Sequence, residues 1–197
     1  SVEDDGTGMT YDEFIKRWMT LNYNRQKRQG ASVQFPDEGE NSKRIAYGRN
    51  GVGRHGMFCF ANSYKIETWK NGVSNIYDIA ISHGNSPYEI INHTIDTKDG
   101  HGTKISAFVD RHLPDANAMT DILSARFMYD PKFVVKINGK NIDLSQHKGV
   151  IYEKEFITKA NAKLMMTIVD SEKTAAKSQQ HGIAFWVSGR LVGQPSW

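Results

Sequence analysis

The chain is organised around Gly48-Arg49-Asn50-Gly51-Val52-Gly53-Arg54-His55-Gly56-Met57-Phe58. Four glycines fall within nine residues here, and an apolar run, Met57 to Ala61, overlaps the end of the stretch. Glycine permits backbone conformations and close approaches that a Cβ forbids. A glycine loop that opens into a helix presents free N–H groups and the positive end of the helix dipole, which together suit phosphate. The pattern predicts either a phosphate-binding loop or a flexible surface loop. It is not a Walker loop, because no Gly-Lys-Ser/Thr follows.

Composition sets broad limits on the class of protein. A chain of 197 residues with 39% hydrophobic and 24% charged residues can form one domain, or one domain plus a fragment, around a real core. The net charge of +3 is too small to argue for nucleic acid by itself. A single cysteine, Cys59, favours a reducing compartment, and no apolar run is long enough to span a bilayer. We therefore expect a cytoplasmic protein.

The segment before the glycine loop contains one clear helix and one long irregular stretch. Thr10 and Glu13 have the spacing of a capping box, and apolar residues recur at helical spacing, so a helix is predicted from Thr10 to about Asn22. Tyr23 to Tyr47 lacks periodicity, which predicts a solvated loop or a mobile lid that retains a polyanionic ligand. Its cations are Arg25, Lys27, Arg28, Lys43 and Arg44.

The segment after the glycine loop has the pattern of an antiparallel meander. A short helix is predicted at 53–62, and Asn71-Gly72 and the turn around Gly100 separate strand-like runs. The predicted strands are Tyr64–Lys70, Val73–Ser82, Tyr88–Asp96 and Thr103–Val109.

Further elements are predicted towards the C-terminus: a helix at Asp115–Met128, strands at Phe133–Ile137, Phe156–Val169 and Gly182–Val192, and a loop or short helix at Asp170–Gln180. The fold class is therefore α/β. We expect a two-layer sandwich, in which a mostly antiparallel sheet from Tyr64 to Ile137 has the helices that begin at Thr10, Gly53 and Asp115 on one face. Further β strands follow this sandwich.

Three stretches together resemble the boxes of the GHKL ATPase superfamily, which includes gyrase B, the large heat-shock chaperones, histidine kinases and mismatch-repair MutL. They are Asp4-Asp5-Gly6-Thr7-Gly8-Met9, the glycine loop Gly48 to Phe58, and Gly102-Thr103-Lys104-Ile105. Their order, with a helix after the first and a meander before the third, is most similar to the chaperone, MutL and Microrchidia branch. The resemblance implies a Bergerat-type ATP-binding domain over residues 1–145 and the start of a transducer-like, β-rich region over 146–197.

The resemblance also implies roles for single residues. Asp4 would accept the adenine amino group, Gly6 and Gly8 would turn the backbone beside the base, Met9 would pack on the ring, and Thr103 would place a hydroxyl near Asp4. The phosphates would be held in the glycine loop, whose implied site residues are Gly48, Arg49, Gly51, Val52, Gly53, Arg54, His55 and Gly56.

The sequence departs from the family at its first box. In the family this box lies on a helix before the aspartate box, and it supplies an asparagine that holds Mg²⁺ and, in hydrolytic members, a glutamate that activates water. The sequence has only three residues before Asp4, so we expect it to be a fragment whose Mg²⁺ ligand and catalytic residue lie outside it. The resemblance implies ATP hydrolysis and an ATP-dependent homodimer, with a protein or DNA client, for an intact protein. Two alternatives stay open: a non-catalytic interaction domain that keeps the fold, and a nucleic-acid module that uses the cations of residues 23–47.

Overall fold

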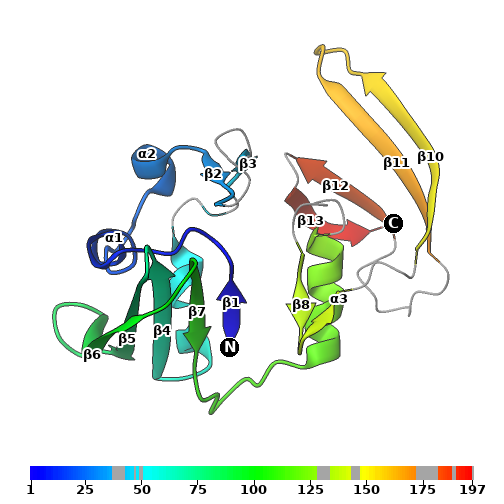
Figure 1. Cartoon of the computed structure of the whole chain (residues 1–197). Coiled ribbons are helices and arrows are strands. Elements are labelled where there is room, and N and C mark those ends of the chain that lie inside the picture. Colours follow the sequence, from blue (N-terminus) through cyan, green and yellow to red (C-terminus); the bar gives the residue numbers. More distant parts are fainter. Residues whose placement is uncertain are drawn as a thin grey trace. The chain divides into compact units, whose positions relative to one another are not determined.

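The computed structural model describes residues 1–36, 43–46, 48, 51–127, 134–142, 147–171, 182–187 and 190–196 (Figure 1). The chain forms two units, Ser1–Leu113 and Pro114–Trp197. Each unit is described by itself. Among the helices within those ranges, none is long and apolar enough to cross a membrane.

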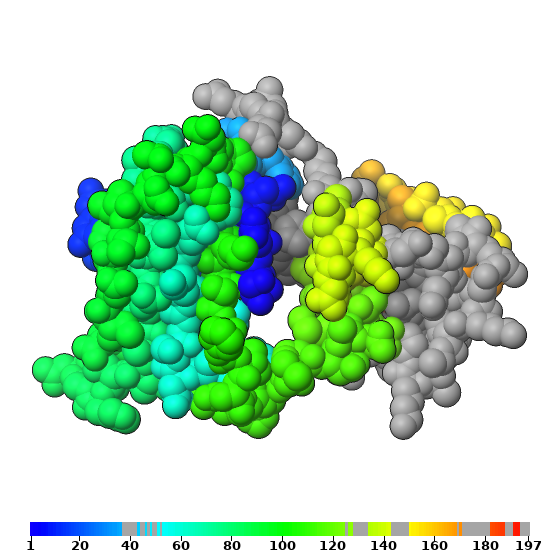
Figure 2. Space-filling view, turned by 60° about the horizontal axis from the view of Figure 1, so that its bottom comes forward, coloured from blue at the N-terminus to red at the C-terminus, as the bar shows by residue number. Residues whose placement is uncertain are grey.

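The first unit is built on one five-stranded sheet in which every neighbouring pair is antiparallel. The order is β1-β7-β4-β5-β6, and Figure 2 shows β1, in blue, at the sheet edge beside β7, in green. Asn71 and Gly72 have φ angles of 56° and 78°, the left-handed values of a two-residue hairpin turn. The α/β fold class and the mostly antiparallel sheet are confirmed. The predicted meander is correct for its first three strands and wrong for the fourth, because β7 pairs with β4 rather than with β6. The strands are β1 (Val2–Asp4), β4 (Ser63–Lys70), β5 (Val73–Ile81), β6 (Tyr88–Thr97) and β7 (Gly102–Ser106).

Two helical segments cover one face of this sheet. Helix α1 (Tyr11–Arg17) starts at the predicted capping box, in which Thr10 Oγ1 accepts from the N–H of Glu13 and Glu13 accepts from the N–H of Thr10. It ends before the predicted Asn22, whose φ of 52° is incompatible with a helix. Segment η1 (Val52–Cys59) is the short helix expected at 53–62, and it is of the 3₁₀ type.

The core lies between these helical segments and the sheet. Alternate residues of β4 and β5 point inward, as a half-buried strand requires. Phe14 of α1 stacks on Tyr77 of β5 with ring centroids 3.8 Å apart, and both side chains are fully buried. Burying a side chain of this size stabilises the fold by roughly 1.5–3 kcal/mol. The cluster comprises Phe14, Tyr64, Ile66, Tyr77, Ile79 and Tyr88.

The stretch expected to be irregular, Tyr23 to Tyr47, contains regular structure. Helix α2 (Arg25–Gln29) begins at an Asn24 cap and ends at Gly30, and strand β2 (Ser32–Gln34) pairs with β3 (Lys43–Ile45). The expectation of an irregular loop is therefore wrong for these parts, while residues 37–42 lie outside the described residues. Elements of three to five residues are too short to give a periodic signal.

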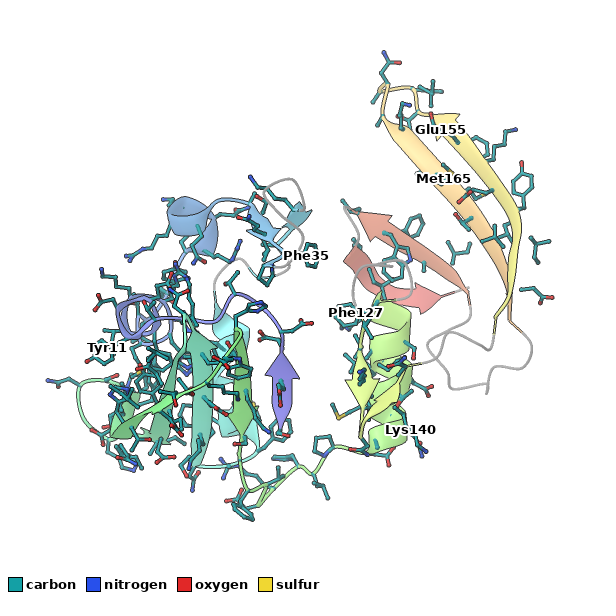
Figure 3. The ribbon with its side chains drawn as sticks, in the orientation of Figure 1. Tyr11, Phe35, Phe127, Lys140, Glu155 and Met165 are labelled. Carbon is teal, nitrogen blue, oxygen red and sulfur yellow. The ribbon has the colours of Figure 1, made fainter. Side chains whose placement is uncertain are left out.

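The described residues of the second unit form one helix and three hairpins. Helix α3 (Ala116–Phe127) begins after Asp115, whose carboxylate accepts from the N–H of Ala118 at 2.8 Å, and it packs on β13. In the longest hairpin Glu155 and Met165 lie opposite one another (Figure 3). The strand pairs are β8 (Lys136–Ile137) with β9 (Lys140–Asn141), β10 (His147–Ile157) with β11 (Lys163–Ser171), and β12 (Ile183–Val187) with β13 (Arg190–Ser196).

Three sequence-based expectations are wrong in this unit. The main sheet does not extend to Ile137, because β8 pairs only with β9 across the Asn138-Gly139 turn, and Val134 is exposed rather than buried. The run Phe156–Val169 is not one strand, since the chain reverses at residues 158–162, where Asn161 has a φ of 58°. The run Gly182–Val192 likewise belongs to two strands. Most of the Asp170–Gln180 segment and Phe133 lie outside the described residues. The functional boundary near residue 145 stays a prediction.

Candidate functional site

A row of polar residues crosses the inner face of the sheet at one end of the strands. Asp4 of β1 pairs with Thr103 of β7, Thr103 with Thr68 of β4, and Thr68 with Asn75 of β5. Directly paired residues share a face of the sheet, so these four side chains form one continuous line. The next row, Val2, Ile105, Ile66 and Tyr77, is apolar. The polar row is therefore the chemically distinctive edge of an otherwise apolar surface.

The first glycine box folds back over this row. The N–H of Gly6 donates to Asp4 Oδ1 at 2.9 Å, and His101 Nδ1 donates to the carbonyl of Gly6 at 2.8 Å. Gly8 has a φ of 60°, and a Cβ added there would lie 1.9 Å from the carbonyl oxygen of Trp69. The backbone thus approaches β4 more closely than any other residue type permits. This approach explains the second glycine of the Asp-x-Gly-x-Gly box.

Thr68 joins the first and third boxes, and sequence reasoning missed it. Its side chain is fully buried, and Oγ1 accepts from the N–H of Met9 at 2.9 Å. The same hydroxyl lies 3.2 Å from the carbonyl oxygen of Gly102 and 3.3 Å from Thr103 Oγ1. The available signal was a threonine at an inward position of β4, but only the register shows that it faces Thr103.

The carboxylate of Asp4 is held in a setting that disfavours its charge. Partial burial raises its pKa above the ordinary value, and the neighbouring charge of Asp5 adds to the effect. Hydrogen bonds from the backbone of Gly6 and Thr103 oppose the shift without cancelling it. The residue as a whole keeps substantial exposure. Among the described residues no cation forms an ion pair with Asp4. A carboxylate that is partly desolvated and still accessible is suited to accept a hydrogen bond from a ligand.

The glycine loop leads into the first turn of η1. Gly51 has a φ of 62°, and η1 begins at the next residue, Val52. The first N–H groups of a helix have no acceptor within the helix. A Cβ added at Gly48, Gly53 or Gly56 would meet no atom of the described residues within 4 Å, so on these sides the described part of the loop has free space. The backbone therefore offers donors and room for an anion. Arg49 and Asn50 lie outside the described residues.

Arg54 binds the protein's own backbone in this structure. Its guanidinium donates to the carbonyl oxygens of Arg17 and Thr20 at the end of α1, and it lies 5.7 Å from the centre of the buried Tyr23 ring. These contacts join the start of η1 to the point where the chain leaves α1. The predicted contribution of Arg54 to phosphate binding stays a prediction.

His55 points into the core. Its Nδ1 lies 2.9 Å from the hydroxyl of Tyr64, which accepts from Trp18 Nε1 at 2.9 Å, and its Nε2 lies 3.2 Å from the carbonyl oxygen of Trp18. Arg54 Nε also lies 3.3 Å from Nε2. A neutral imidazole with its proton on Nε2 donates to the Trp18 carbonyl and accepts from Tyr64, whereas one with its proton on Nδ1 donates to Tyr64 and accepts from Arg54. Burial, together with the charge of Arg54, lowers the pKa of His55 to about 4. The side chain is thus a neutral structural link, and only the backbone of His55 is free for the predicted phosphate contact.

Glu13 ties α1 to the sheet beside the polar row. Its carboxylate lies 2.8 Å from Arg17 Nη2 and 3.0 Å from Lys70 Nζ, in addition to the bond from Thr10. Partial burial acts to raise the pKa of Glu13, but the hydrogen bonds from Thr10 and Lys70 and the charge of Arg17 together lower it. These contacts fix the helix that follows the first box.

A shallow hollow opens at the same end of the sheet, between the first box and the hairpin turns. None of the predicted nucleotide-contacting residues lines it, so we do not place the base there. Its lining residues are Thr7, Pro36, Lys70, Asn71, Gly100 and His101.

Comparison with known proteins identifies the class to which this arrangement belongs. Residues 1–109 match the family described as histidine kinase-, DNA gyrase B-, and HSP90-like ATPase. The chain belongs to this family, and its first unit contains a GHKL-type ATP-binding domain. No match was found among curated proteins. The resemblance inferred from the three boxes is thereby confirmed at the level of the superfamily.

Proposed function

We propose that this domain binds ATP with the adenine at the Asp4 end of the polar row and the phosphates at the glycine loop, and that the triphosphate closes the segment 23–47. The observation that carries this proposal is the juxtaposition of Asp4 and Thr103 as direct partners on neighbouring strands. Carboxylate and hydroxyl oxygens side by side are suited to an exocyclic amine. Gly6, Gly8 and Met9 would then flank the base.

The residues present fit the nucleotide in three respects. Gly8 lets the first box lie against β4, the carboxylate of Asp4 remains accessible, and the loop at Gly48–Gly56 has free space with the N–H groups of Val52, Gly53 and Arg54 at a helix start. Mg²⁺ would offset the charge of the bound phosphates. Among the described residues no group of three or more His, Cys, Asp or Glu side chains is arranged to hold a metal.

For an intact protein we propose that ATP binding is coupled to conformational change, dimerisation and hydrolysis. Lid cations interact more strongly with a triphosphate than with a diphosphate, so a ligand that gains this contact shifts the lid towards its closed state. The nucleic-acid alternative is less favoured because two of its cations are already used. Arg25 donates to the carbonyls of Gly30 and Ser32, and Arg28 lies over Tyr23.

A thermal-shift titration with ATP, the non-hydrolysable analogue AMP-PNP, GTP and duplex DNA tests the proposal. We expect stabilisation by ATP and AMP-PNP, of about 2.7 kcal/mol at a hundred times Kd, and a smaller effect of GTP. Stabilisation by DNA with none by ATP would favour the nucleic-acid module.

Hydrogen exchange of residues 23–47 tests the closure of the lid. Protection should be greater with AMP-PNP than with ADP at saturating concentrations of each. Equal protection in the two states would show that the segment does not sense the γ-phosphate.

A further inference from the structure

The hydroxyl of Thr68 lies at the centre of the bonds that connect the first and third boxes. It accepts from the N–H of Met9 at 2.9 Å and donates to the carbonyl of Gly102 at 3.2 Å, while Thr103 Oγ1 is 3.3 Å away. The side chain has no exposure to solvent. A buried hydroxyl has one proton and two acceptor positions, so its neighbours restrict one another's roles.

At 3.3 Å either threonine hydroxyl could donate to the other, and we assign the direction from the other partners of Thr68. The carbonyl of Gly102 can only accept, so it takes the proton of Thr68. The N–H of Met9 can only donate, so it occupies one acceptor position of Thr68. The remaining position accepts the proton of Thr103. Thr103 Oγ1 then presents only lone pairs to a ligand.

We propose that Thr68 is a positioning residue that makes the base pocket selective for an amino group over a keto group. This inference rests on the proposed function. With Thr103 held as an acceptor beside the carboxylate of Asp4, two acceptors face the ligand, directly or through a water. An exocyclic amine satisfies them, whereas the keto oxygen of hypoxanthine or guanine leaves them unpaired. Leaving buried polar groups unpaired is what makes such discrimination strong.

The test compares ATP with ITP, which replaces the adenine amine by a keto group, using calorimetry on the whole chain. Thr68→Val removes the hydroxyl and keeps the shape, which frees Thr103 to donate. We expect the ratio of ATP to ITP affinity to fall roughly tenfold, the effect of one buried hydrogen bond. Thr68→Ser keeps the hydroxyl and should retain the wild-type ratio.

Two further variants separate selectivity from stability. Ser74→Ala removes an equally buried hydroxyl on the opposite face of the sheet, where Ser74 donates to Glu67 at 3.2 Å, so it should lower the midpoint of unfolding without changing the ratio. Thr103→Val removes the acceptor itself and should lower the ratio, and adding Thr68→Val to it should change the ratio no further.

The outcomes distinguish the two proposals. If the wild-type chain binds neither nucleotide, the proposed function fails. If it binds ATP and prefers it to ITP, but Thr68→Val or Thr103→Val keeps the wild-type ratio, ATP binding stands and the role of Thr68 is overturned. If it binds ATP and ITP equally, ATP binding stands, but the placement of the adenine amine at Asp4 and the role of Thr68 are both overturned. Because Thr103→Val tests the acceptor directly, the inference can be refuted even where Thr68→Val does not fold.

Discussion

Replacing Asp4 by asparagine should lower the affinity for ATP by roughly ten- to a hundredfold and leave the fold intact. The substitution keeps an oxygen that can accept from the N–H of Gly6, a bond of 2.9 Å in this structure. It removes the negative charge that would face the adenine amine. A hydrogen bond to a charged group contributes about 1.5–3 kcal/mol, and each 1.4 kcal/mol corresponds to a factor of ten.

Asp5→Asn is the matched control, because it changes the net charge equally at the next residue. Asp5 lies beyond the end of β1, and it is its backbone carbonyl, not its carboxylate, that accepts from His101 at 3.0 Å. Calorimetry of ATP binding at pH 7 should show a large loss for Asp4→Asn and little change for Asp5→Asn. Equal losses would mean that only the overall charge matters and that the assignment of Asp4 is wrong.

Asp4→Asn, which should weaken ATP binding, should at the same time make the fold more stable at pH 7. Burial raises the pKa of Asp4, so the folded state binds a proton there more tightly than the unfolded state. The stability that this proton contributes is present below the unfolded pKa and is lost as the pH rises through the folded pKa. At pH 7 the ionised carboxylate therefore destabilises the fold. Urea unfolding at pH 7 should give a higher midpoint for Asp4→Asn than for the wild type, and a lower midpoint would contradict this reasoning.

Three further predictions concern the framework of the site. Gly8→Ala should lower the free energy of unfolding, measured in urea, by at least about 1–3 kcal/mol. The causes are the left-handed φ of Gly8 and the 1.9 Å between an added Cβ and the Trp69 carbonyl oxygen. Gly84→Ala is the control and should be tolerated, because the nearest atom to its added Cβ is 3.5 Å away. Glu13→Gln should lower the free energy of unfolding at pH 7. This loss relative to the wild type should shrink as the pH falls through the lowered pKa of Glu13, below 4.5. A loss that does not depend on pH would exclude the ion pairs as its cause. His55 should titrate near pH 4 by NMR, and stability should fall between pH 6.5 and about 4, because the unfolded chain takes up a proton that the folded chain excludes; an ordinary titration near 6.5 would refute its buried, neutral role.

The sequence predicted the first unit well, because its signals are local. The capping box at Thr10 and the Asn71-Gly72 turn each depend on residues a few positions apart, and the strands of the meander alternate clearly. The second unit was predicted less well. The reversal near Asn161 lacks the glycine-containing pair that marked the first hairpin, so its two strands were predicted as one. Between β12 and β13 the sequence does contain such a pair, Ser188-Gly189, and the prediction of a single strand there overlooked it.

The sequence predicted the residues of the three boxes, but it did not predict the hydrogen bonds that join them. The boxes identified Asp4 and Thr103, but the place of Thr68 between them depends on a strand register that no local pattern contains. Arg54 and His55 were grouped with the phosphate contacts because of their position in the glycine loop. Their side chains instead contact α1, which is remote in sequence.

The position of Arg54 makes the segment 23–47 a closed loop. After α1 the chain passes Thr20 and Tyr23, and it returns to the same place at Gly51. Three residues later, the guanidinium of Arg54 donates to the carbonyl of Thr20 and lies over the ring of Tyr23. When the two ends of a loop are fixed together, its length affects stability only weakly, and each doubling costs about 0.6 kcal/mol. The segment 23–47 can therefore be lengthened or shortened while the polar row and the glycine loop keep their places.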